Sequence, residues 1–180
     1  MTRQTNLPGG ACLVNGPYFS DQRGFSYEAF NCSLYQIAPL PFSIAQENIV
    51  YTANSGTIRG LHYQVEPFAQ SKLVMVIKGR AQFFWVSLEE TVESRVVHSI
   101  CLDADGTALL TPAICAHGFL ALEDDTIFSL KMSAPINHAM RGEISVFADD
   151  LEINFAIPPA INLLTDRDRS APNYENRRRS

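Results

Sequence analysis

The sequence has few of the features that would point to a membrane, secreted or nucleic-acid-binding protein. Its 180 residues contain no apolar run of transmembrane length, and the polar start MTRQTNLPGG does not resemble a signal peptide. The four cysteines are scattered and include no CxxC pair, so we expect reduced thiols in a cytoplasmic protein. With a net charge of −5, no general attraction to nucleic acid or to an anionic membrane is expected.

Linkers and internal repeats are also missing, and what remains has the pattern of strands. We therefore expect a single domain over residues 1–180. Short segments rich in β-branched and aromatic residues follow one another between turn signals: SIAQENIVYT, KLVMVIKG, AQFFWVSL, SRVVHSICL, TALLTP and DTIFSLKMS. Many short strands at this spacing predict a mainly β jelly roll, as a sandwich or barrel. The FFWV run is apolar on both faces, as in a central strand between two layers.

The C-terminal part of the chain has a different pattern. After Pro158 and Pro159, the stretch PPAINLLTDRDRSAPNYENRRRS predicts one or two short helices. Its final residues, 173–180, are rich in arginine and polar residues, and we expect them to form a solvated tail.

Two of the four histidines stand in short segments with polar neighbours. His62 lies in RGLHYQ, between Arg59 and Lys72, and His117 lies in CAHGF. Because a jelly roll can bring distant strands to one pocket, we expect these four side chains to share a small-ligand site. His98 has no polar neighbours in its strand and is expected to be structural or at the surface.

The residues leave two chemistries open at this pocket. A metal site needs three or four converging histidine or carboxylate ligands, for which only His62, Glu66 and His117 are available. Removal of a proton next to a ketone needs a base, a cation at the carbonyl oxygen and an anchor for the rest of the substrate. His62, Lys72 and Arg59 supply these three types, so we favour proton transfer and expect no metal.

Several motifs in a fixed order resemble the dTDP-4-dehydrorhamnose 3,5-epimerase family. The resemblance extends from Phe19 to about Pro172 and is carried by FSDQRGFSYEAF, QEN followed by GTIRGLHYQ, QSKLV, AHGF and LTDRDRSAP. It implies a cupin-like jelly roll, a homodimer with the N-terminal strands at its interface, and no cofactor. It also implies a nucleoside-diphosphate-linked 4-keto-6-deoxy sugar as substrate.

The resemblance further implies roles for individual residues. His62 would remove the proton alpha to the 4-keto group, Asp168 would pair with His62, and Lys72 would steady the enolate oxygen. From its local sequence Asp168 could also be a helix-start or turn residue, but we favour the pairing. Arg59 would lie near the diphosphate, and Arg23 would reach from the neighbouring subunit to hold phosphate. The full set of expected substrate contacts is Arg23, Arg59, His117, Phe19, Glu28, Gln46 and Asn48.

The chain departs from the family pattern at a catalytic position. The family's tyrosine, which donates a proton to the face opposite the histidine, falls near Ala134, and there is no tyrosine between Tyr63 and Tyr174. Without that donor a single base would return the proton to the face it came from. We therefore consider a substitute donor (His138, Lys131 or water), inversion of one centre only, or binding of a nucleotide sugar without turnover. Inversion at C3 alone is the outcome we favour.

Overall fold

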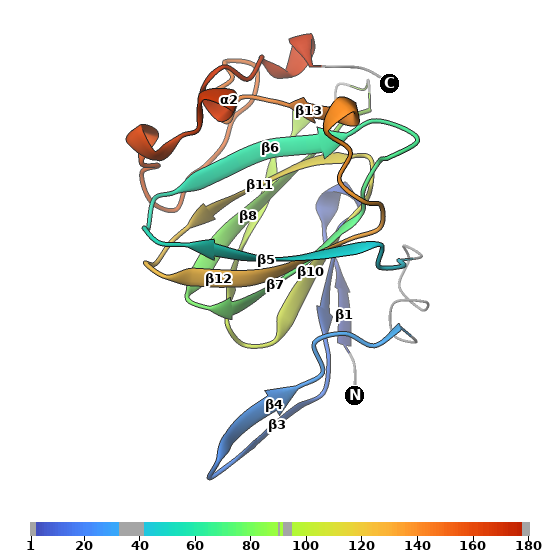
Figure 1. Cartoon of the computed structure of the whole chain (residues 1–180), viewed down its shortest axis with the longest axis vertical. Helices are drawn as coiled ribbons and strands as arrows, with labels where there is room; N and C mark the ends of the chain where they lie inside the picture. Colours follow the sequence, from blue (N-terminus) through green and yellow to red (C-terminus); the bar gives the residue numbers. More distant parts are fainter. Residues whose placement is uncertain (1–2, 33–41, 90, 92–94, 178–180) are drawn as a thin grey trace.

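A computed structural model describes residues 3–32, 42–89, 91 and 95–177 of the chain. Two antiparallel sheets lie face to face in a β-sandwich (Figure 1). The six-stranded sheet has the spatial order β1 (Arg3–Asn6), β2 (Cys12–Asn15), β10 (Thr107–Thr111), β7 (Lys72–Lys78), β12 (Thr126–Met132) and β5 (Gln46–Thr52). The five-stranded sheet has the order β13 (Arg141–Glu143), β6 (Ile58–Gln64), β11 (Cys115–Ala121), β8 (Arg80–Ser87) and β9 (His98–Asp103). The predicted mainly β jelly-roll sandwich is confirmed.

Strand β8 shows why the sequence folds into layers. Phe83 and Trp85 point into the apolar cluster between the two sheets, whereas Phe84 and Val86 belong to a cluster on the other side of the five-stranded sheet. Because successive side chains of a strand point to opposite faces, a strand that is apolar throughout must be covered twice. The expectation of a central strand packed between layers is therefore confirmed.

The C-terminal segment supplies the second cover. The sequence predicts one or two short helices after Pro158, and the segment contains three: η4 (Ile161–Leu163), α2 (Asp166–Arg169) and η5 (Tyr174–Asn176). Figure 1 shows these elements over the outer side of the five-stranded sheet. Two further 3₁₀ turns, η1 (Pro8–Gly10) and η3 (His138–Met140), lie within loops.

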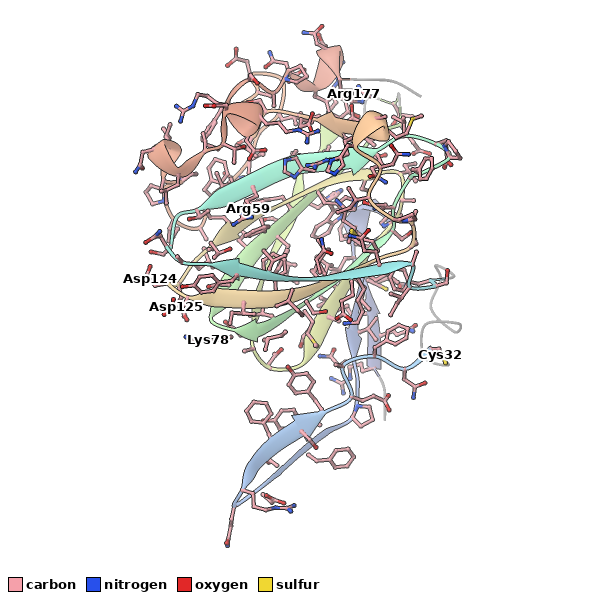
Figure 2. The ribbon with its side chains drawn as sticks, viewed as in Figure 1. Cys32, Arg59, Lys78, Asp124, Asp125 and Arg177 are labelled. Carbon is pink, nitrogen blue, oxygen red and sulfur yellow. The ribbon has the colours of Figure 1, made fainter. Side chains whose placement is uncertain are left out.

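The prediction of a solvated tail is wrong for the residues that the structure describes at the C-terminus. Tyr174 is 2% exposed and Arg177 is 7% exposed. The Tyr174 hydroxyl donates to the carbonyl oxygen of Ser87 at 2.6 Å. Arg177, which is labelled in Figure 2, donates to the carbonyl oxygen of Leu88 at 2.8 Å. Tertiary contacts with the end of β8 therefore hold this segment in place, while residues 178–180 lie outside the described part of the chain.

The N-terminal part of the chain contains a β-hairpin, β3 (Tyr18–Asp21) and β4 (Gly24–Tyr27), that projects from one end of the sandwich (Figure 1). Its strands carry a ladder of stacked aromatic rings, formed by Tyr18, Phe25 and Tyr27. Tyr18 and Phe25 remain more than half exposed, at 51% and 59%.

All four cysteines are free thiols, in agreement with the absence of a disulfide framework from the sequence pattern. Cys12 and Cys115 are buried, and burial raises the pKa of both thiols, that of Cys115 to about 12. They therefore stay protonated and pack as small apolar side chains. Among the described residues, no helix has the length and apolar character needed to span a membrane.

Candidate active site

Strands β6 and β11 carry the two histidine motifs and pair with each other. His62 is the direct partner of His117 in this antiparallel pair, and the register shifts between His117 and Phe119. A glycine in each motif makes the pairing possible: a Cβ atom on Gly60 would lie 2.6 Å from the Cα atom of Gly118. Gly60 also has φ of +121°, which other residues rarely adopt. RGLHYQ and AHGF thus encode a close backbone approach that places both imidazoles on one face.

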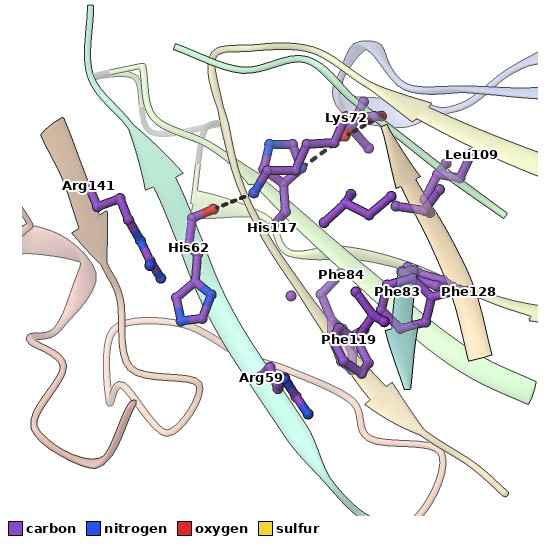
Figure 3. A pocket seen from close by; sticks show the side chains of 15 residues that line it. Arg59, His62, Lys72, Phe83, Phe84, Leu109, His117, Phe119, Phe128 and Arg141 are labelled. Carbon is purple, nitrogen blue, oxygen red and sulfur yellow. Dashed lines mark hydrogen bonds between the residues drawn. The ribbon is translucent and has the colours of Figure 1, made fainter. Parts of the chain in front are cut away.

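That face forms one wall of a cavity of about 250 Å³ between the two sheets (Figure 3). The five-stranded sheet contributes polar and charged side chains to it from β6, β11 and β13, including His62 and His117. The six-stranded sheet contributes Lys72 and Thr111 among mostly apolar side chains. The complete lining is Val50, Arg59, His62, Lys72, Val74, Phe83, Phe84, Leu109, Thr111, His117, Gly118, Phe119, Phe128, Leu130 and Arg141.

His62 and Asp168 form a hydrogen-bonded pair, although 106 residues separate them in the sequence. The Nε2 atom of His62 lies 2.6 Å from Oδ1 of Asp168. Thr165 caps helix α2 by accepting from the Asp168 amide, and its hydroxyl donates to Oδ2 of Asp168 at 2.9 Å. Asp168 is therefore both a residue of the first helical turn and the partner of His62, so the two roles considered from its sequence are compatible.

The charge state of Asp168 fixes the tautomer of His62. Burial raises the pKa of this carboxyl, but the hydrogen bond from His62, the positive charges nearby and the Thr165 hydroxyl outweigh it and hold the pKa below its usual value. An ionised carboxylate can only accept, so Nε2 of His62 carries the hydrogen. The Nδ1 atom is left with a lone pair, which is the arrangement of a general base.

Lys72 reaches the same site from the opposite sheet. Its ammonium donates to the carbonyl oxygen of His62 at 3.2 Å, which leaves two of its three N–H groups for other acceptors. Burial and, to a smaller extent, the positive charge of Arg141 together lower the pKa of Lys72 to about 7. The sequence predicted a cation here, and the structure shows one that can lose its proton near neutral pH.

His117 is a neutral acceptor in the cavity. Its Nδ1 lies 2.8 Å from the Thr111 hydroxyl, which in turn donates to the carbonyl oxygen of Lys72 at 3.3 Å. With the hydroxyl donating to that carbonyl oxygen, Nδ1 carries the hydrogen, and the buried Nε2, which has no hydrogen-bond partner among the described residues, keeps a lone pair. Burial and the charge of Lys72 hold the pKa of His117 well below its usual value. This lone pair could accept a hydrogen bond from a hydroxyl group of a ligand.

Two arginines border the cavity, and the sequence pointed to only one of them. Arg59 is exposed and lies over the ring of Phe119, with 6.0 Å between its guanidinium carbon and the ring centroid. Arg141, which sequence reasoning missed, comes from β13 and points toward His62 in Figure 3. The sequence around Arg141, MRGE, resembles surface sequence and so gives little indication of a site residue. Only the pairing of Arg141 with Gln64 shows that Arg141 lies on the same face of the sheet as His62.

Five predicted substrate contacts lie outside the cavity lining of this single chain. Phe19 is 66% exposed on β3, and the Arg23 side chain, at the tip of the hairpin, is 90% exposed and paired with Asp21. Gln46 and Asn48 lie on β5 and bond to each other at 3.0 Å. Glu28, the fifth of these residues, follows β4, and its backbone amide donates to the carbonyl oxygen of Pro17.

The alternative metal site is not supported by the arrangement of its proposed ligands. Within residues 3–32, 42–89, 91 and 95–177, no three histidine, cysteine or acidic side chains gather in a way that could hold an ion. Glu66 is exposed and absent from the cavity lining. One ring nitrogen of each histidine is already engaged, Nε2 of His62 by Asp168 and Nδ1 of His117 by Thr111.

A β-sandwich whose cavity holds both a carboxylate-bound histidine and a partly buried lysine is typical of an acid–base enzyme that acts on carbon next to a carbonyl group. Comparison with known proteins narrows this class. The sequence model of the dTDP-4-dehydrorhamnose 3,5-epimerase family matches residues 4–176, so the chain belongs to this family. The expectation of an epimerase-type isomerase is thereby confirmed at the level of the family.

Individual relatives agree with this assignment. The dTDP-4-dehydrorhamnose 3,5-epimerase of Sinorhizobium fredii is 33% identical over 165 residues, covering 89% of this chain and 83% of that protein. The crystal structure of the Bacillus anthracis enzyme with TDP and PPi bound has a TM-score of 0.88 at 30% identity, covering 96% of this chain and 99% of that one. A 3′-monoepimerase from Streptomyces bikiniensis in complex with dTDP-quinovose has a TM-score of 0.85 at 28% identity, covering 94% and 87%.

Proposed function

We propose that this protein is an epimerase of a nucleoside-diphosphate-linked 4-keto-6-deoxy sugar. The observation that carries the proposal is the 2.6 Å contact between His62 and Asp168 beside the partly buried Lys72. Relatives named for both kinds of epimerase, 3,5- and 3-, share the fold over most of their length. The expectation that the protein is cytoplasmic stays a prediction.

The mechanism begins with proton abstraction. The 4-keto group makes the hydrogens at C3 and C5 acidic, and the Nδ1 lone pair of His62 takes one of them. Asp168 stabilises the imidazolium that forms, as an ionised partner at hydrogen-bonding distance does. The electrons move to the C4 oxygen, where the positive charge of Lys72 stabilises the enolate by an amount commonly about 3–4 kcal/mol per well-placed donor. Proton delivery to the opposite face then completes the inversion.

A homodimer would complete the substrate site. The projecting β3–β4 hairpin exposes Tyr18, Phe19 and Phe25, and exposed aromatic side chains in one place are typical of a protein–protein contact. Arg23 at its tip lies far from the cavity of its own chain, so it would bind phosphate only in a neighbouring subunit. The Bacillus anthracis relative, with TDP and PPi bound, supports a diphosphate in the site.

Inversion at C3 alone is our narrower proposal. The segment of Ala134 to Ile136 has no hydroxyl group, and glutamines bind it through its backbone: Gln70 donates to the Ala134 carbonyl oxygen at 2.7 Å, and Gln46 accepts from the Ile136 amide at 2.9 Å. This segment therefore offers no phenol to the cavity. The 3′-monoepimerase relative supports single-centre inversion within the family.

The decisive experiment is incubation of the protein with dTDP-4-keto-6-deoxyglucose in deuterium oxide, followed by NMR of the sugar. Deuterium at C3 with inversion at that centre alone is the expected result. Label and inversion at both C3 and C5 would overturn the narrower proposal and retain the broader one. No label with this sugar or with its CDP- and GDP-linked counterparts, together with ligand-induced thermal stabilisation, would identify a binding protein without turnover.

A further inference from the structure

The position of the far-face proton donor can be narrowed by elimination. Lys131, a donor considered from the sequence, lies on the outer side of the six-stranded sheet, where its Nζ contacts Glu47 at 2.7 Å and Ser129 at 2.6 Å. His138 is exposed on η3. Neither side chain lines the cavity. Among the residues of this chain that the structure describes, a proton donor therefore has to come from the cavity wall itself.

The wall that faces His62 offers two side chains with exchangeable protons. Among the described residues that line the cavity from the six-stranded sheet, only Lys72 and Thr111 carry an N–H or O–H group. The rest of this wall is apolar: Val50, Val74, Leu109, Phe128 and Leu130. The Thr111 hydroxyl donates to a backbone carbonyl and accepts from His117, so its proton is engaged. Lys72 alone has N–H groups to spare.

We propose that Lys72 donates the proton to the sugar face opposite His62 and so replaces the phenol that this chain lacks. This role rests on the proposed epimerase function. In the first step the C3–H bond breaks, its proton binds Nδ1 of His62, and its electrons form the enolate. In the second step an N–H bond of the Lys72 ammonium breaks and its proton bonds to C3 from the other face, which restores the ketone. His62 is left protonated and Lys72 neutral, and exchange with water resets both.

The surroundings of Lys72 favour an ammonium group that can release its proton over one that stays charged. The ionisable groups that face it are His62 on β6, His117 and Cys115 on β11, and Arg141 on β13. None of these is a carboxylate, so no counterion holds the proton on the amine. A lysine whose pKa is about 7 is half protonated near neutral pH, where an ordinary lysine would be too weak an acid. C3 is bonded to C4, so an ammonium at the C4 oxygen also reaches C3.

The test separates proton exchange from inversion. Exchange needs only His62 and a stabilised enolate, whereas inversion also needs the far-face donor. Deuterium uptake at C3 and formation of the inverted sugar are both measured by NMR in deuterium oxide, for the wild type, Lys72→Arg, Lys72→Met and Lys78→Met. Lys72→Arg keeps a positive charge, but a guanidinium does not release its proton near pH 7. Lys78 lies at the exposed end of the same strand and serves as the matched control.

In Lys72→Arg we expect exchange within about tenfold of the wild type and inversion lower by at least about 10²-fold, the range of general acid catalysis. In Lys72→Met exchange also falls, but inversion falls further, so the ratio of exchange to inversion rises in both variants. Lys78→Met should match the wild type. An equal fall of exchange and inversion, or inversion by Lys72→Arg at the wild-type rate, overturns the donor role and leaves the epimerase intact. No exchange by the wild type overturns both proposals.

Discussion

Each side of the six-stranded sheet holds one lysine that is at least partly buried, and the surroundings of the two lysines differ. Lys131 on β12 faces outward, and Glu47 and Ser129 bind its ammonium. Lys72 on the neighbouring strand β7 faces the cavity, and its ammonium donates to the carbonyl oxygen of His62. A buried charge with its counterion is a structural element, whereas one without a counterion is unfavourable for folding. Such a group marks a functional site, because catalysis uses the proton that it can release.

The largest effect on the cavity side should come from His62→Ala. Without the base, deuterium uptake at C3 should fall by about 10³-fold or more, while the melting temperature changes little because the side chain is partly exposed. NMR exchange and a thermal melt measure the two quantities. His138→Ala, at an exposed histidine outside the cavity, is the control and should behave as the wild type. Near-normal exchange in His62→Ala would remove this histidine as the base.

Asp168→Asn should have the next largest effect. The amide keeps the size of the side chain but removes the negative charge that stabilises the His62 imidazolium. We expect the exchange rate to fall by about 10²–10⁴-fold, as for a buried carboxylate partner of a catalytic histidine. Asp166→Asn, at an exposed acid in the same helical turn, should leave the rate unchanged. Equal rates in the two variants would contradict the dyad.

Stability should respond to Lys72→Met in the opposite direction from activity. The pKa of Lys72 in the folded protein, about 7, is below its usual value of 10.5, so folding disfavours the charged form. This lowers the free energy of unfolding of the wild type by its full amount at and below pH 7. The loss disappears as the pH rises toward 10.5, because Lys72 then loses its proton in the unfolded chain as well. We expect Lys72→Met to raise the free energy of unfolding by about 1–3 kcal/mol at pH 6. Urea unfolding at pH 6 and pH 10 should show the gain at pH 6 only, and a loss of stability at pH 6 would contradict this account.

Lys131→Met should have the smallest effect, and it should lower the free energy of unfolding where Lys72→Met raises it. Hydrogen bonds from Lys131 and Ser129 lower the pKa of Glu47, so the ion pair stabilises the protein above the usual pKa of this carboxyl and is lost as the pH falls below it. Since Glu47 is 44% exposed, solvent screens the pair, and we expect a loss of about 1 kcal/mol or less at pH 7. The difference from the wild type should vanish near pH 3. Changed deuterium exchange in this variant would show that the two sides of the sheet are not independent.

The sequence predicted the strands and the two histidine motifs correctly because these depend on local patterns. Alternation of side chains along a strand and the glycines of RGLHYQ and AHGF are properties of neighbouring residues. Where prediction was wrong, distant contacts were the cause. Tyr174 and Arg177 read as part of a solvated tail, yet carbonyl groups almost 90 residues earlier in the chain hold both. Arg141 was missed because a three-residue strand has too little pattern to show which way it faces.

By itself the sequence determined that the chain forms a β-sandwich and that His62 and His117 stand in short motifs with polar neighbours. Its resemblance to a family supplied Asp168 as a partner. The sequence also placed Lys72 in the expected pocket and left Lys131 open as a proton donor, and only the tertiary structure decided that Lys131 faces away from the cavity. Lys72 and Lys131 both lie in apolar strands with alternating side chains, and a local pattern defines two faces without saying which one meets the other sheet. That choice depends on the pairing of β7 and β12 within one sheet and on the sheet that packs against it.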